Sequence, residues 1–125
     1  MKYLGIDYGT KRIGVAISDE NGEYAFPKTI LDRHQALQEI VLLCTQESIG
    51  AIVIGYSVAS NGIENEVTQK AAQFKEKVAE ATHLPVHFER EDYSSVEAHR
   101  YQIKAGNRDD SAAAIILQRY LDKQR

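Results

Sequence analysis

The sequence predicts an α/β domain in which one mixed sheet is flanked by helices. Three short segments rich in Ile, Val, Leu and Tyr follow one another near the N-terminus before any helical pattern appears. Further along, strand-like runs alternate with helical patterns, which is typical of strands joined by helical crossovers. The 125 residues are 43% hydrophobic, which suffices for one core. We therefore expect a single domain over residues 1–125.

An antiparallel meander of three strands is expected first, over residues 2–7, 13–19 and 24–31. The segment from Tyr8 to Arg12 has the composition and length of a hairpin connection. Asn21-Gly22 is a strong signal for the second reversal. No helix interrupts these strands, so they should pair in sequence order.

Helices and strands then alternate. Asp32 has the residue type of a helix N-cap, and apolar residues recur at helical spacing from Ala36 to Cys44 until Gly50. After this helix we expect strand 51–55, helix 64–83, strand 86–89, a helix from the capping-box pattern at Ser94 to Gly106, and a last helix opened by Asp109. The result is a five-stranded sheet with the meander and two parallel strands.

Composition excludes several classes of protein. No apolar run approaches the roughly 18 residues of a membrane helix, and Met1 leads almost directly into a strand, so we expect a cytoplasmic protein without membrane contact. The single cysteine, Cys44, is expected as a buried thiol, and the four histidines are too scattered for a zinc site. The net charge of −3 argues mildly against binding nucleic acid through overall charge, although the distribution of charge matters more.

Asp7 is the first candidate site residue, because it ends an otherwise apolar strand. Burying an ionised carboxylate costs several kcal/mol unless a cation or hydrogen bonds compensate, which suggests metal binding. The alternative is a carboxylate that accepts backbone N–H groups of the Gly9-Thr10 turn. Lys11 and Arg12 in the same turn are candidates for phosphate contacts, or else they are solvated turn charges.

Four motifs in register resemble the YqgF/RuvX family of RNase H-like proteins. They are LGIDYGTKRIGVAISD (residues 4–19), AIVIGYSVASNG (51–62), PVHFEREDYSSVEA (85–98) and DDSAAAIILQRYLD (109–122). The resemblance spans nearly the whole chain and implies an RNase H-like fold. It also implies a nuclease that processes the 5′ end of pre-16S rRNA, with Holliday junction resolution as an alternative activity.

Site residues follow from the resemblance position by position. Asp7 matches the family's first-strand aspartate, Glu91 the glutamate of its DER-type motif, and Asp109 the aspartate of its last helix. Asp110 remains a rival to Asp109, since either of two adjacent acids at a helix start can be the ligand or the cap. We favour Asp109 because it shares a helix face with Ala112 and Ile116, which are expected to face the sheet.

Three carboxylates from separate elements suit one or two Mg²⁺ or Mn²⁺ ions and phosphodiester hydrolysis. Without metal they would repel one another and the substrate, so metal dependence is part of the prediction. The expected partner is nucleic acid, either precursor rRNA or a DNA junction.

The sequence departs from the family pattern in two places. The DER-like triplet is Arg90-Glu91-Asp92, so Arg90 would have to replace the missing arginine from the other side of Glu91. The stretch before Asp109 is also shorter than the basic loop usual in the family. Ser94 and Ser95 keep the hydroxyls of the family's Thr-Thr pair and are candidate substrate contacts.

Two other functions stay open at this stage. One is a chain that has lost most of its activity through these changes and binds RNA or a protein instead. The other is nucleotide binding, because the Gly-Ile-Asp-x-Gly-Thr signature also opens actin-like ATPases. Those proteins clamp ATP between two such domains, however, and this chain has the length of one.

Overall fold

The computed structural model describes residues 1–9, 12–57, 66–91 and 110–124, and gives only the backbone at 57, 66–68, 90–91 and 110–111. Its elements are β1 (Tyr3–Tyr8), β2 (Arg12–Ser18), β3 (Ala25–Asp32), α1 (Ala36–Gln46), β4 (Ala51–Ser57), α2 (Glu66–Thr82), β5 (Val86–Glu91) and α4 (Asp110–Lys123). Of the predicted elements, only the helix from Ser94 to Gly106 lies outside the described residues.

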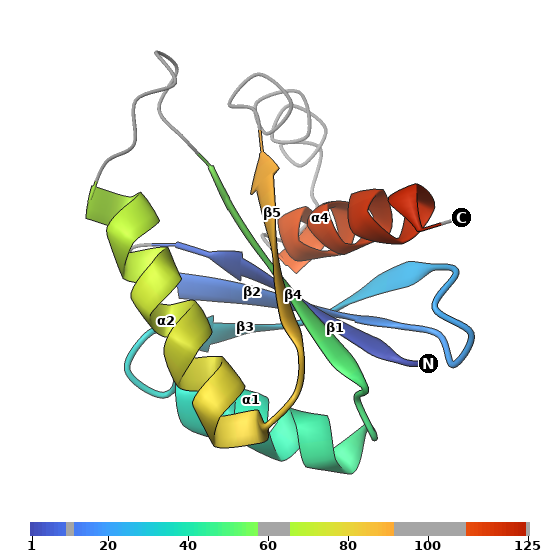
Figure 1. The fold of residues 1–125 in the computed structure, drawn as a ribbon, viewed down its shortest axis with the longest axis horizontal. Coiled ribbons are helices and arrows are strands. Elements are labelled where there is room, and N and C mark those ends of the chain that lie inside the picture. Colours follow the sequence, from blue (N-terminus) through green and yellow to red (C-terminus); the bar gives the residue numbers. More distant parts are fainter. Residues whose placement is uncertain (10–11, 58–65, 92–109, 125) are drawn as a thin grey trace.

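The five strands form one sheet in the order β3-β2-β1-β4-β5. β1, β2 and β3 pair antiparallel, whereas β4 is parallel to β1 and β5 is parallel to β4. The predicted meander with two added parallel strands is therefore confirmed. Because β1 is the central strand, its C-terminal end lies at the middle of one edge of the sheet (Figure 1).

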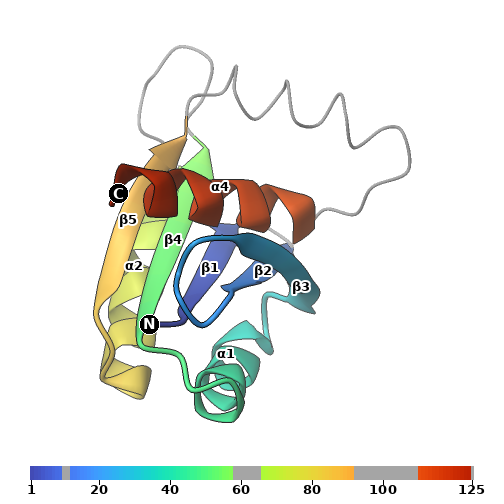
Figure 2. The same ribbon diagram turned by 90° about the vertical axis from the view of Figure 1, so that its right-hand side faces the viewer.

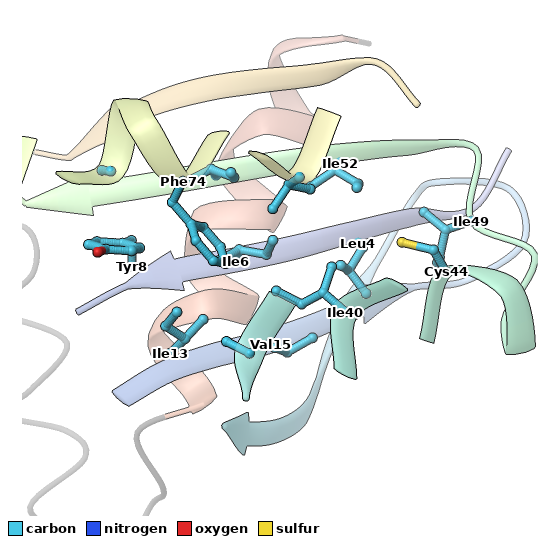
Figure 3. Packing of buried hydrophobic residues seen from close by; sticks show 14 of the residues in the cluster. Leu4, Ile6, Tyr8, Ile13, Val15, Ile40, Cys44, Ile49, Ile52 and Phe74 are labelled. Carbon is cyan, nitrogen blue, oxygen red and sulfur yellow. The ribbon is translucent and has the colours of Figure 1, made fainter. Parts of the chain in front are cut away.

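Helices cover both faces of the sheet, α1 and α2 on one and α4 on the other (Figure 2). The larger core joins the first face to α1 and α2 through fully buried residues such as Leu4, Ile6 and Ile40 (Figure 3). A smaller core joins the second face to α4 through Val53 and Leu117. The two faces of β1 thus alternate between these cores, as the period of a strand requires.

The predicted cap of the first helix is wrong. Asp32 is the last residue of β3, in register with Arg12, and its carboxylate accepts the backbone N–H of His34 at 2.9 Å. This hydrogen bond closes a turn before the helix, a common competing use of an aspartate side chain. The N-cap is Gln35, without a side-chain cap.

Other local expectations agree with the structure. Gly22 has φ +68° in the second reversal, where the Asp19 carboxylate accepts the backbone N–H groups of Glu23 and Tyr24 at 2.7 and 2.8 Å. These bonds, above all the one from Tyr24, lower the pKa of Asp19. Cys44 is buried as predicted, and burial raises the pKa of its thiol to about 11. Across the described part of the chain, no helix combines the length and apolar character needed to cross a membrane.

Candidate active site

Asp7 lies near the C-terminal end of β1 and is partly exposed. In the sheet it is in register with Gly14 on β2 and with Gly55 on β4. Directly paired residues project from the same face of a sheet, so the two side chains that would flank Asp7 are both absent. Of these three paired positions, only Asp7 therefore carries a side chain.

The face that carries Asp7 is the one covered by α4. A Cβ added at Gly5, one pleat before Asp7, would lie 2.7 Å from Leu117 Cβ, and one added at Gly55 would lie 2.5 Å from Ile116 Cγ2. These approaches are closer than carbon atoms tolerate, so the helix rests directly on the two glycines. The close packing fixes α4 on the face of the sheet that carries Asp7.

Glu89 is a buried carboxylate on this face that the sequence did not single out. It is in register with Gly55, so the row across the sheet reads Gly14, Asp7, Gly55, Glu89. Glu89 is 7% exposed and forms an ion pair with Lys123 at the end of α4. Two strand spacings, roughly 9–10 Å, separate its backbone from that of Asp7.

Tyr120 continues the contact between α4 and β5. Its ring stacks on His87 with the centroids 5.3 Å apart and also packs against Tyr3 at 6.0 Å. Partial burial, followed by the nearby Tyr3 and Glu89, raises the pKa of the Tyr120 phenol. Period-two alternation could have assigned His87 and Glu89 to one face, but not the lysine of α4 that meets Glu89.

The structure gives the backbone positions of three further candidate residues, Arg90, Glu91 and Asp110. β5 runs to Glu91, two residues beyond the predicted end, and pairs Arg90 with Tyr56 and Glu91 with Ser57. Glu91 thus lies two residues beyond Glu89, at the same edge of the sheet as Asp7. Asp110 is the first residue of α4.

Arg12 is the exposed first residue of β2. The remaining predicted site residues lie outside the described residues: Lys11, Ser94, Ser95 and Asp109. Among the described side chains, no three of the His, Cys, Asp or Glu type gather closely enough to hold a metal ion. What the described residues bring together is Asp7 on β1 and the ends of β4 and β5.

Comparison with known proteins agrees with the motifs. The family model described as RuvX, Holliday junction resolvase, matches residues 1–123. A protein of Nitratidesulfovibrio vulgaris (strain DSM 19637 / Miyazaki F) is 37% identical, over 98% of this chain and 94% of its own length. One of Paraburkholderia xenovorans (strain LB400) is 38% identical, over 95% of this chain and 86% of its own length. Both carry the name "Putative pre-16S rRNA nuclease".

Solved structures share the fold at low sequence identity. Thermus thermophilus RuvC in complex with a Holliday junction substrate aligns with a TM-score of 0.62 and 14% identity, covering 99% of this chain and 95% of that one. The Holliday junction resolvase of fowlpox virus aligns with a TM-score of 0.56 and 13% identity, covering 98% and 99%. The RNase H-like fold predicted from the motifs is thus confirmed.

Proposed function

This chain belongs to the RuvX family, and on that premise we propose that it is a divalent-metal-dependent nuclease acting on the 5′ end of precursor 16S rRNA. The names of its relatives supply the substrate, and the family description supplies the class of reaction. The proposal treats residues 1–125 as one nuclease domain. Work on ribosomal RNA precursors would place the protein in the cytoplasm.

The observation that carries the proposal is the setting of Asp7. A partly exposed carboxylate ends the central strand, and glycines occupy the positions on both sides of it. A partly exposed carboxylate near the end of a strand is accessible to a hydrated cation and to a phosphate group.

The donor set fits a hard cation. We assign Asp7, Glu91 and Asp109 as the residues that would hold Mg²⁺ or Mn²⁺, because such ions prefer carboxylate oxygens. By strand alternation, position 91 belongs to the same face as position 89. Asp110 opens the helix that lies over this face, so an acid at its start is suitably placed. When bound, the metal activates water and offsets charge on the phosphate.

The chain's own residues have three tasks in this reaction. The carboxylate of Asp7 supplies negative charge at a fixed point, because β1 is hydrogen-bonded on both sides within the sheet. The close contact of α4 with Gly5 and Gly55 holds that helix against the sheet. Glu89 forms an ion pair with Lys123, which helps to hold the end of α4 against β5.

A four-way DNA junction is the alternative substrate. The family description and the RuvC neighbour concern Holliday junctions, although the latter likeness speaks for the fold alone. Cleavage of a synthetic junction, compared with cleavage of precursor 16S rRNA at equal concentration, distinguishes the two. We expect faster turnover of the RNA.

Replacing Asp7 by Asn tests the metal-dependent reaction. The amide keeps the shape of the side chain but removes its charge, so we expect RNA cleavage in Mg²⁺ or Mn²⁺ to fall by at least about 100-fold. Excess EDTA should abolish wild-type cleavage. Rates are measured on end-labelled precursor RNA, and circular dichroism checks that the variant is folded.

Glu76→Gln is the matched control, because Glu76 is an exposed carboxylate on α2, which covers the opposite face. It should cleave like the wild type. A folded Asp7→Asn protein with unchanged activity, or wild-type activity that persists in EDTA, would contradict the proposed reaction.

A further inference from the structure

A second feature at the same edge of the sheet is a basic pocket between α1 and α2, here named the α1–α2 pocket. Its volume is about 420 Å³, within the range of about 300–1,000 Å³ usual for ligand sites. It lies over the end of β1, and the residues that characterise it are Tyr8, Arg33, His34, Lys70, Phe74 and Lys77.

The pocket is lined by basic residues, although the chain as a whole has an excess of acidic ones. The protein has 18 acidic and 15 basic residues, yet the described lining contains Arg33, Lys70 and Lys77 and no carboxylate. Lys70 and Lys77 lie seven residues apart on α2, which places them on one stripe of the helix. Arg33 and Lys77 also share this lining, and like charges repel one another. An anion in the pocket would relieve that repulsion.

Tyr8 gives a second, independent indication of a ligand. Its side chain lies beside Phe74, with ring centroids 5.3 Å apart, and is only 7% exposed (Figure 3). Its hydroxyl makes no hydrogen bond with any described residue, although a buried phenol ordinarily has a partner. A ligand oxygen in the pocket would supply that partner.

The pocket is next to the candidate active site along the chain. Tyr8 follows Asp7 directly, so their Cα atoms are about 3.8 Å apart and their side chains occupy opposite faces of β1. The candidate active site and the pocket therefore lie on opposite faces of the same strand end.

We infer that the α1–α2 pocket binds a phosphate group of the RNA strand next to the bond that is cleaved. The inference rests on the proposed function, which identifies the bound strand as RNA. The residues that line the pocket indicate that the bound group is a phosphate. Arg33 offers a forked donor, Lys77 offers a point charge, and the Tyr8 hydroxyl offers a neutral hydrogen bond. The phosphate is either an internal phosphodiester or a terminal 5′-monophosphate.

RNA binding by charge-neutralised variants tests the inference. In an Asp7→Asn background, which prevents cleavage, the Kd of a single-stranded precursor RNA is measured by fluorescence anisotropy at several salt concentrations. We expect Arg33→Gln/Lys77→Gln to weaken binding about tenfold and to lower the salt-dependence slope by about 0.7, the value for one lost phosphate contact on a single strand. Tyr8→Phe, which removes only the hydroxyl, should weaken binding a few-fold.

Lys75→Gln is the matched control, because Lys75 lies on the same helix outside the pocket, over the ring of Phe88. The RNA is used with a 5′-hydroxyl and with a 5′-monophosphate. A loss with both RNAs assigns the pocket to an internal phosphodiester, and a loss only with the second assigns it to the terminal phosphate.

Variants that bind both RNAs like the Lys75→Gln control, or a parent protein that binds neither RNA, would overturn the inference. The outcome is separate from that of the proposed function. If the parent protein binds RNA through this pocket but the wild type does not cleave that RNA in the presence of metal, the inference about the pocket stands and the proposed nuclease reaction is contradicted.

Discussion

At the scale of single residues, the glycines under α4 determine how closely the helix approaches the sheet. At Gly5 the atoms that a new Cβ would meet are Leu117 Cβ and the Ala113 carbonyl oxygen, at 2.7 and 3.2 Å. Neither atom can move without shifting the helix backbone. At Gly55 the atoms belong to the side chain of Ile116, which can change its rotamer.

Gly5→Ala is therefore expected to destabilise the protein by about 1–3 kcal/mol, the usual cost of overpacking. Gly55→Ala should cost less, because Ile116 can turn aside. Urea denaturation followed by circular dichroism gives both free energies of unfolding. Equal stability of Gly5→Ala and the wild type would show that α4 does not rest on β1 as described.

The residues of the site divide into those that sequence could predict and those that it could not. The sequence singled out Asp7, since a carboxylate at the end of an apolar strand is costly unless a cation or hydrogen bonds compensate its charge, and its role as a metal ligand stays a prediction. Glu89 was missed, because its burial depends on Lys123, which lies 34 residues away in sequence. Asp32 was misassigned, because the same carboxylate can cap a helix or close a turn, and the backbone that decides between them is set by pairing with β2.

At the scale of elements, the ion pair between Glu89 and Lys123 ties the end of α4 to β5. The Glu89 side chain is 8% exposed and the Lys123 side chain 62%. Removal of the ammonium group would leave a carboxylate in a buried position without its partner. The expected loss is therefore larger than for an ordinary surface pair.

Lys123→Met keeps most of the aliphatic stem and is expected to lower the free energy of unfolding by about 1–2 kcal/mol. The double variant Glu89→Gln/Lys123→Met should recover part of this loss, because no buried charge is left unpaired. Thermal and urea denaturation of the four proteins in this cycle give the coupling energy. A coupling energy of zero would contradict a structural role for the pair.

At the scale of the whole molecule, the order of the elements was predictable and their arrangement in the sheet only partly so. Alternating apolar residues and turn signals located the meander, and helical spacing located α1, α2 and α4. Sequence patterns did not determine that β1 lies between β2 and β4, because strand order depends on long-range packing. That central position is what brings Asp7 to the edge where β4 and β5 end.

Charge is also organised at the molecular scale. The net charge of −3 argued only mildly against binding of nucleic acid through overall electrostatics. The structure separates an acidic feature, Asp7 beneath α4, from a basic one, the α1–α2 pocket on the other face. The distribution thus offers two different surfaces to a nucleic-acid strand at one edge of the sheet.

The most direct test of the metal site is a crystal structure of the protein soaked in Mn²⁺, examined by anomalous diffraction. We predict an anomalous peak bonded to the Asp7 carboxylate at about 2.2 Å, with Glu91 and Asp109 as further ligands. If Asp110 is a ligand in place of Asp109, the alignment of the last helix with the family motif shifts by one residue and the metal site stays where it is. Absence of a peak at Asp7 in crystals that bind Mn²⁺ elsewhere would contradict the assignment of Asp7 as a metal ligand.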